Sequence, residues 1–261
     1  MENEARNFQR YPWATGPHWI PVPKRIRVRF GNRYVADSQR VMLMPGLPAV
    51  YYFPEKHVCM DLLERSDHKS HSENLGEASY WHLRAGDKRV ENAAWCYESP
   101  TEQAPENLSK YIAFDWKAMD MWLEEDEPVR VHPRDPYTRL DVINSSRHVK
   151  IVLEDQILAD TTRPTLLFET GLPTRFYIPV TDVRMDLLEP SGKKTECPYK
   201  GTASYYSTVI GGKKIENIAW YYPFPQPEVI KIKDLVCFYT ERMDELIVDG
   251  ESLPKLGMPK P

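Results

Sequence analysis

Short runs of alternating polar and apolar residues recur along the chain. Arg25–Phe30 alternates basic and apolar residues with a period of two, and Lys150–Leu153 begins a similar run. Such alternation is typical of a strand with one buried face. Val50–Phe53 and Arg175–Ile178 are β-prone runs that are each followed by proline. No helical period persists beyond about two turns. We therefore predict an all-β protein built from antiparallel strands.

The same pattern of residues occurs twice. Met60–Glu64 reads MDLLE and recurs 125 residues later as Met185–Glu189. At that same offset, segment 76–97 aligns without a gap with segment 201–222, and 11 of the 22 positions are identical. Self-similarity of this length is the signature of a duplicated structural unit. The sequence therefore predicts two tandem, homologous copies of one β-rich domain.

The repeat also sets the expected domain boundaries. We expect the two copies to dock through related surfaces as an internal pseudo-dimer. The stretch between them is polar and contains prolines, which predicts a linker with little regular structure. The predicted order is a proline-rich leader (1–24), the first copy (25–136), the linker (137–148), the second copy (149–251) and a C-terminal tail (252–261).

A β-hairpin is the clearest element in each copy. In the first copy, residues 86–87 begin with glycine and lie between two β-prone runs, which suits a two-residue turn. The second copy has glycines at the same place. A regular register from this turn would pair Leu83 with Val90 and Trp81 with Asn92.

One face of this hairpin would carry aromatic rings around a glutamate. An acid among such rings can bind a small organic or cationic ligand. Burial would raise the pKa of the carboxyl group, which is the condition for a general acid or base. The alternative is a core aromatic cluster whose glutamate reaches a backbone amide or an arginine. The residues are Tyr80, Glu91, Trp95 and Tyr97 in the first copy and Tyr205, Glu216, Trp220 and Tyr222 in the second.

Two further pairs of charged residues occur at equivalent places in the copies. Asp61 and Asp186 lie in the MDLLE segments and are either outward-facing strand residues or acids of a groove. Arg40 and Arg163 each follow an aspartate by three residues. Either these arginines form an ion pair with that aspartate, or they point into the groove to hold a carboxylate or phosphate.

Composition and charge narrow the classes of function. The chain is 41% hydrophobic and 28% charged with a net charge of −4, which fits a soluble globular protein without general affinity for nucleic acid. No apolar run reaches the roughly 20 residues of a membrane span. The first residues lack the features of a secretory signal, so we expect a cytoplasmic protein without membrane association.

Motifs for metal and cofactor chemistry are weak. His57, His68 and His71 lie close together in the sequence, but the second copy has Asp182, Lys193 and Glu196 at these positions. A solvated loop is therefore expected, with no metal site and no cofactor. The usual phosphate-loop, dinucleotide and nucleophile-elbow motifs are absent from the sequence. Hydrolase, kinase and dehydrogenase functions thus lack their usual signatures.

Several linked blocks carry a resemblance to a known family. Segment 200–228, KGTASYYSTVIGGKKIENIAWYYPFPQPE, is followed by VCFY and by Met243-Asp244. Together they resemble the family called domain of unknown function 427, and segment 76–100 looks like a second copy. The resemblance implies compact β-tent domains in which sheets lean together over a groove. The first copy has Leu75 where the second has Lys200, so any ligand-binding role of that lysine would be confined to the second copy.

Two functions remain open at this point. The first is a small-molecule-binding protein with an aromatic groove, which could also perform cofactor-independent acid–base chemistry of the isomerase, lyase or cyclase type. Glu91 or Glu216 would then shuttle the proton. The alternative is a non-enzymatic module that binds a ligand or a protein. Differences between the copies, such as Trp81 against Tyr206, suggest that only one of them is active.

Overall fold

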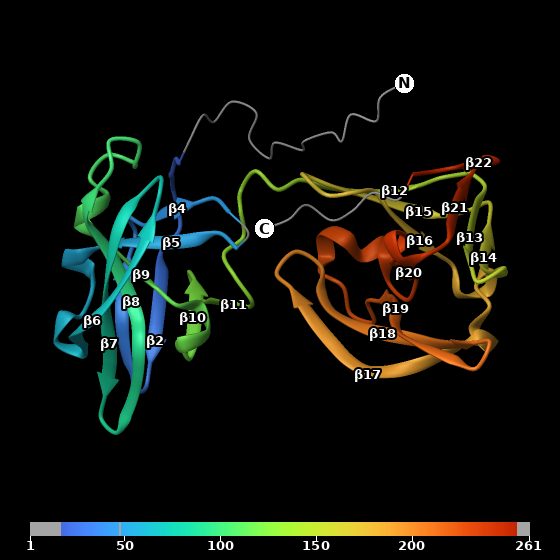
Figure 1. The fold of residues 1–261 in the computed structure, drawn as a ribbon. Coiled ribbons are helices and arrows are strands. Elements are labelled where there is room, and N and C mark those ends of the chain that lie inside the picture. The colour runs from blue at the N-terminus through green and yellow to red at the C-terminus, as the bar shows by residue number, and fades with distance from the viewer. Residues whose placement is uncertain (1–16, 47, 255–261) are drawn as a thin grey trace. The chain divides into compact units, whose positions relative to one another are not determined.

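The computed structural model describes residues 17–46 and 48–254 and divides them into two compact units. The boundary between the units along the chain lies between Asp135 and Pro136. We call residues 17–135 the N-terminal copy and residues 136–254 the C-terminal copy. Within the described residues, each copy contains a seven-stranded sheet and a four-stranded sheet, and every ladder between strands is antiparallel (Figure 1). The predictions of an all-β fold and of tandem homologous copies are confirmed.

The N-terminal copy joins strands that are distant in sequence. Its larger sheet has the order β1 (Ile20–Pro21), β4 (Met42–Met44), β5 (Val50–Pro54), β9 (Tyr111–Phe114), β8 (Lys88–Pro100), β7 (Gly76–Ala85) and β6 (Leu63–Ser72). Its smaller sheet has the order β11 (Glu127–Val129), β10 (Met121–Glu124), β2 (Ile26–Phe30) and β3 (Arg33–Ser38). Short 3-10 turns connect them: η1 (Glu55–His57), η2 (Met60–Leu62), η3 (Leu108–Lys110) and η4 (Trp116–Ala118).

The C-terminal copy repeats this arrangement. Its larger sheet has the order β12 (Leu140–Asn144), β15 (Thr165–Glu169), β16 (Arg175–Ile178), β20 (Val236–Phe238), β19 (Lys213–Tyr221), β18 (Gly201–Ile210) and β17 (Leu188–Cys197). Its smaller sheet has the order β14 (Gln156–Thr161), β13 (Val149–Leu153), β21 (Glu245–Val248) and β22 (Glu251–Ser252). The 3-10 turns are η5 (Val180–Asp182), η6 (Met185–Leu187), η7 (Pro227–Ile232) and η8 (Thr240–Arg242).

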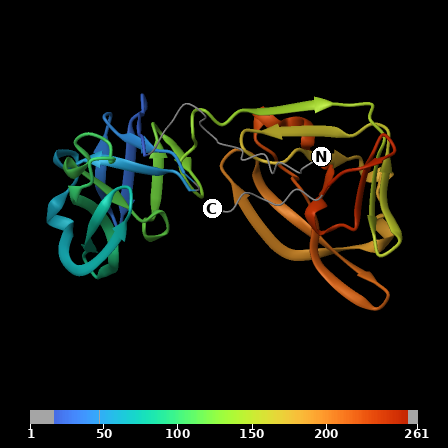
Figure 2. The same ribbon diagram turned by 45° about the horizontal axis from the view of Figure 1, so that its top comes forward.

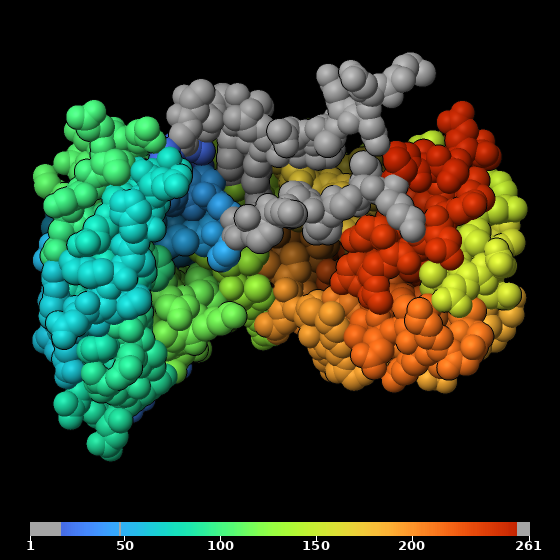
Figure 3. Space-filling model, viewed as in Figure 1, coloured from blue at the N-terminus to red at the C-terminus, as the bar shows by residue number. Residues whose placement is uncertain are grey.

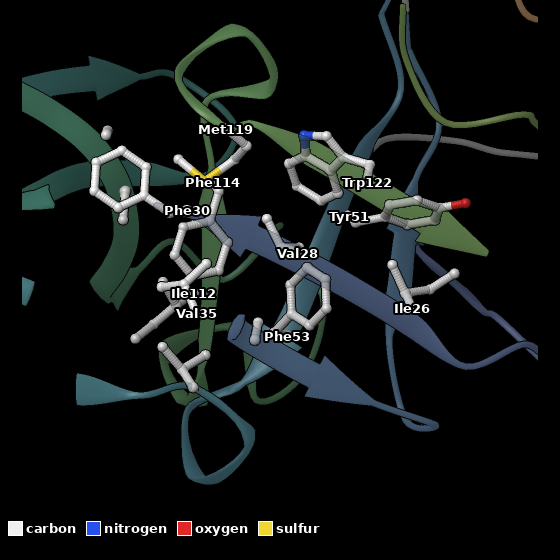
Figure 4. Close-up of a cluster of buried hydrophobic side chains, with 14 of the residues drawn as sticks. Ile26, Val28, Phe30, Val35, Tyr51, Phe53, Ile112, Phe114, Met119 and Trp122 are labelled. Carbon is white, nitrogen blue, oxygen red and sulfur yellow. The ribbon is translucent and has the colours of Figure 1, made fainter. Parts of the chain in front are cut away.

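The main core of each copy lies between its two sheets. In the N-terminal copy the alternation expected at 25–30 places Ile26, Val28 and Phe30 on the buried face of β2. These side chains pack against Phe53 of β5 and Phe114 of β9 (Figure 4). A second apolar cluster covers the opposite face of the larger sheet in both copies. Both faces of this sheet are therefore covered, and Tyr80 and Trp95 of the central hairpin pack with the second cluster.

A bulge in the central hairpin shifts the predicted register. Leu83 pairs with Val90 as expected, but Trp81 pairs with Ala94 instead of Asn92, so that residues 91–93 of β8 lie opposite the single residue His82. Asn92 has the left-handed φ of 51°, a conformation that asparagine tolerates better than most residues. The predicted pairing of Trp81 with Asn92 was therefore wrong.

Hydrogen bonds hold this bulge in the same way in both copies. Ser66 Oγ donates to Asn92 Oδ1 over 2.6 Å, and Asn92 N–H donates to His82 Nδ1 over 3.1 Å. In the C-terminal copy, Asn217 has a φ of 52° and makes matching bonds to Ser191 and Ser207. The bulge is thus a duplicated feature of the fold. The long hairpin of the first copy is drawn in teal to green in Figure 1, and Figure 2 shows the orange hairpin of the second copy.

Three local expectations need correction. The predicted linker includes β12, which pairs with β15 as an edge strand of the C-terminal copy. The proline-rich leader includes β1, which pairs with β4, whereas its first 16 residues lie outside the described residues. The MDLLE segments are not strands throughout: each opens with a 3-10 turn, and β6 and β17 follow it. These two edge strands carry mainly exposed residues and lie at the surface of their copies (Figure 3).

Equivalent glycines provide a test of the duplicated hairpin. Gly76 and Gly201 have φ values of 99° and 98°, and an added Cβ would lie 2.8 Å from Ser99 O and 2.9 Å from Phe224 O. We expect Gly76→Ala and Gly201→Ala each to lower the free energy of unfolding of their copy by roughly 1–3 kcal/mol, measured by chemical denaturation. Gly192→Ala is the control, because nothing lies within 4 Å of its added Cβ. Equal stability of all three variants would contradict this interpretation of the hairpin.

Candidate functional site

The aromatic residues predicted on one hairpin face do lie together. Tyr80 pairs with Trp95 across the hairpin, and both pack in one cluster with Tyr97 and the buried Tyr52. The C-terminal copy forms the equivalent cluster from Tyr205, Trp220, Tyr222 and Tyr177. Burial raises the pKa of Tyr97 and of Tyr222 above the ordinary tyrosine value, so both phenols stay neutral near pH 7.

Hydroxyl groups fix the outer tyrosine of each cluster. Tyr80 OH and Ser70 Oγ are 2.9 Å apart, and Tyr205 OH and Thr195 Oγ1 are 2.8 Å apart. A charged or aromatic side chain of β6 or β17 also lies over each ring: His68 packs edge-on against Tyr80, and the Lys193 ammonium lies 4.8 Å from the Tyr205 ring centroid. The two clusters therefore share a framework built by strand pairing.

The glutamates do not join these clusters. Glu91 lies in the bulge, exposed to solvent, and accepts a hydrogen bond of 2.8 Å from Arg89. That hydrogen bond and the charge of Arg89 lower the pKa of Glu91, the opposite of the raised pKa that a buried general acid requires. Glu216 is also exposed, and its carboxylate lies 3.5 Å from the Lys214 ammonium. The expectation of desolvated proton shuttles was wrong because the bulge turns this part of the strand to solvent.

A pocket of about 380 Å³ lies against the aromatic cluster of the N-terminal copy. It is found where β9 ends at Phe114, so that β5 and β8 are no longer bridged by a strand. Val50 of β5 and Asn92 of β8 both line it. Its aromatic walls come from Tyr51, Tyr80, Trp95, Phe114, Trp116 and Trp122.

Part of this wall was not expected from the sequence. Trp116 and Trp122 stack in parallel with ring centroids 4.3 Å apart, and Trp122 Nε1–H donates to Trp116 O over 3.1 Å. Both residues come from segments outside the repeated hairpin block, which is why the comparison of the copies did not select them. The equivalent of Trp116 in the C-terminal copy is Thr240.

Four residues with polar or charged side chains line the pocket: Asn92, Asp115, Lys117 and His132. Asp115 begins the 3-10 turn η4, and its Oδ1 accepts the N–H of Lys117 over 3.0 Å. His132 lies beside the backbone of the next residue, with Nδ1 and Pro133 O separated by 2.8 Å. The lining of the pocket thus combines flat aromatic rings with exposed residues of both charges.

The equivalent place in the C-terminal copy is filled by its own side chains. Arg175 occupies the position of Val50, Tyr239 that of Asp115 and Glu241 that of Lys117. We call these three residues the plug. The ring centroids of Tyr239 and Trp220 are 4.5 Å apart. The Arg175 guanidinium lies 5.4 Å from the Trp220 ring centroid.

A buried ion pair secures the plug. Arg175 Nη1 and Nη2 donate to the two carboxylate oxygens of Glu241 over 2.8 and 3.1 Å, and only 11% and 17% of the two side chains are exposed. A guanidinium is attracted to the face of an aromatic ring, and its planar shape loses little conformational entropy when it pairs with a carboxylate. The same framework is therefore open in one copy and closed in the other.

Lys200 pairs with a buried glutamate of the C-terminal copy. Its ammonium is 2.5 Å from Glu169 Oε2, and only 13% and 9% of the two side chains are exposed. In the first copy Leu75 stands at the position of Lys200, as the sequence indicates, and Met44 and Val50 form the apolar neighbourhood. The structure places Lys200 in a buried ion pair of the C-terminal copy.

The arginines of the ADxxR segments do not pair with their own aspartates. Asp37 binds Arg25, with Nε and Oδ1 at 2.7 Å, and Arg163 binds Asp182, with Nη2 and Oδ1 at 2.9 Å. Asp160 instead lies 2.6 Å from His148 Nε2. The expected internal pair was therefore wrong, because the strand alternation directs each aspartate toward the neighbouring strand β2 or β13. Arg40 is exposed and does not line the pocket.

The remaining candidates also lie apart from the pocket. Asp61 pairs with Arg33 and Asp186 with Arg184, at 2.7 and 2.5 Å, and all four side chains are more than half exposed. His57 Nδ1 lies 2.7 Å from Ser38 Oγ. Within residues 17–46 and 48–254, no group of three potential His, Cys, Asp or Glu ligands is arranged to hold a metal ion.

Comparison with known families agrees with the duplicated geometry. The model of the domain of unknown function DUF427 matches residues 19–125 and again residues 141–249. The chain belongs to the DUF427 family. No curated protein matches it. The two DUF427 matches contain the two aromatic clusters, one with an open pocket and one with the plug.

The structure also bears on membrane association. In the part of this DUF427 protein that the structure describes, no helical segment has the length and apolar character needed to cross a bilayer.

Removal of one plug charge should destabilise the C-terminal copy. Burial alone would raise the pKa of Glu241, but the hydrogen bond and charge of Arg175 outweigh it and hold the pKa below the ordinary 4.5. Glu241→Gln should therefore lower the free energy of unfolding by roughly 1–3 kcal/mol at pH 7, measured by urea denaturation.

The lowered pKa of Glu241 also predicts how this stability difference changes with pH. A lowered folded-state pKa stabilises the protein above the unfolded pKa and loses that effect as pH falls through the folded pKa. The stability difference between wild type and Glu241→Gln should thus shrink below pH 4.5. Glu245→Gln, which changes an exposed glutamate of β21, is the control and should change little. A difference that grows at low pH would contradict the assignment.

Proposed function

We propose that the N-terminal copy binds a small organic molecule in its aromatic pocket and that the C-terminal copy does not. The observation that carries this proposal is the contrast at three equivalent positions. Val50, Asp115 and Lys117 leave a volume of about 380 Å³ beside Trp95, whereas Arg175, Tyr239 and Glu241 occupy the corresponding place beside Trp220.

The size and walls of the pocket support a small ligand. Its volume falls within the roughly 300–1,000 Å³ that is typical of small-molecule sites. Flat indole and phenol rings supply stacking surface, and a few polar groups at the rim can orient a ligand. Stacked Trp116 and Trp122 are held by a hydrogen bond to the backbone, so this wall is ordered before a ligand arrives.

Binding is better supported than acid–base catalysis. Glu91 lies outside the pocket lining with a lowered pKa, and Asp115 is exposed and accepts a hydrogen bond within its own turn. A general acid or base of the kind first expected needs a carboxyl group held among apolar side chains with a raised pKa. The pocket of the N-terminal copy therefore fits a ligand-binding module best.

A transplant of the plug tests this proposal. The variant Val50→Arg/Asp115→Tyr/Lys117→Glu places the three plug residues of the C-terminal copy into the N-terminal copy. We expect it to fold and to lose affinity for planar aromatic fragments by roughly tenfold or more, which corresponds to about 1.4 kcal/mol. Ligand-observed NMR with a panel of neutral, anionic and cationic aromatic fragments measures this loss.

Two controls separate the pocket from the rest of the protein. Glu91→Gln changes a carboxylate outside the pocket lining and should leave fragment binding unchanged. Trp220→Ala removes the tryptophan of the plugged copy and should leave binding in the N-terminal copy intact. Fragment binding that survives the transplanted plug, or that is lost in Trp220→Ala alone, would overturn the proposal.

A further inference from the structure

The plug shows which chemical groups this framework holds against its tryptophan. In the C-terminal copy, the Tyr239 ring packs 4.5 Å from Trp220, and a charged group, the Arg175 guanidinium, pairs with Glu241. The plug therefore supplies an aromatic ring and a charge that complements position 241. In the N-terminal copy the two residues that supplied them are replaced by Asp115 and Val50, which carry no ring and no cation.

The charge that a ligand must complement is reversed between the copies. Position 241 holds a carboxylate, and its partner in the plug is a cation. The equivalent position in the N-terminal copy holds Lys117, which lines the pocket. Among the described residues, no carboxylate oxygen lies within 4.0 Å of the Lys117 ammonium. A ligand that takes the place of the plug would therefore present an anionic group to Lys117.

A second residue with a donor group, Asn92 of β8, lines the same pocket. Asn92 Oδ1 accepts the Ser66 hydroxyl, and its backbone N–H donates to His82, so the side-chain NH₂ is its remaining hydrogen-bond donor. An amide NH₂ can only donate hydrogen bonds. Lys117 and Asn92 thus offer one charged and one neutral donor, and such a pair suits an ionised acceptor.

We infer that the ligand of the N-terminal copy is a planar aromatic molecule that carries a carboxylate or similar single anionic group. Its ring stacks on Trp95 as the Tyr239 ring packs on Trp220, and its anionic group accepts hydrogen bonds from Lys117 and Asn92. Asp115 at the rim disfavours a second negative charge near the first. This inference rests on the function proposed above and adds the chemical class of the ligand.

Three probes with one ring system test the charge preference. Naphthalene carboxylate, carboxamide and carboxamidine share size and shape and differ in charge. We expect the carboxylate to bind the wild-type protein roughly fivefold or more tightly than the carboxamide, and the carboxamidine most weakly, by calorimetric titration. Because Lys117 is exposed, this preference should weaken with added salt.

Substitutions at Lys117 should change the order without unfolding the protein. Lys117→Gln should abolish the advantage of the carboxylate, and Lys117→Glu should make the carboxamidine the tightest of the three. Lys110→Glu is the matched control, because it makes the same change of charge on an exposed lysine of η3 that does not line the pocket. It should keep the wild-type order.

The outcomes distinguish the two proposals. Tighter binding of the carboxamidine to wild type, or an unchanged order in Lys117→Glu, overturns the anionic class while the pocket itself remains supported. Equal affinities of the three probes that also survive the transplanted plug would overturn the binding function of the pocket. A reversed order in Lys117→Glu together with an unchanged order in Lys110→Glu would support both.

Discussion

The left-handed asparagine in the central hairpin determines where the functional side chains of each copy lie. Asn92 and Asn217 adopt φ values of 51° and 52° and place three residues of one strand opposite a single residue of the other. Beyond this bulge, each tryptophan is brought directly opposite a tyrosine of the partner strand. Without it, a regular register would move the tryptophan along its partner strand and leave the glutamate over the sheet.

The two copies use this common framework differently. In each, a short central strand of the larger sheet, β9 or β20, ends beside the tryptophan. Arg175, Tyr239 and Glu241 close the space there with a ring and a buried ion pair. Removal of one partner leaves the other charge buried and unpaired, so Arg175 and Glu241 depend on each other. Smaller or oppositely charged residues at these positions leave the space open in the N-terminal copy.

The sequence predicted the fold better than the site. Period-two alternation in 25–30 and the gapless repeat were sufficient for the strands, the tandem copies and the grouping of Tyr80 with Trp95. The bulge at Asn92 was missed because the register was extended regularly from the turn, and this error brought Glu91 into the supposed site. An asparagine two residues after a paired β-branched residue, Val90 in the first copy and Ile215 in the second, was the available signal.

Other features depended on contacts between distant segments. Trp116 and Trp122 reach the pocket from the chain that follows β9, and nothing in the repeat marked them. The plug joins Arg175 and Glu241, which are 66 residues apart. Their contrast with Val50 and Lys117 was visible in the aligned copies, but only the structure places these positions side by side.

The central claim is that one aromatic site is open and its duplicate is closed. It is tested most directly by fluorine NMR of the protein labelled with fluorotryptophan, with the Trp95 and Trp220 signals assigned from Trp→Phe variants. Addition of a planar aromatic carboxylate should shift the Trp95 signal and leave the Trp220 signal in place. A shift of Trp220 alone, equal shifts of both, or no shift of Trp95 at saturating probe would contradict the account.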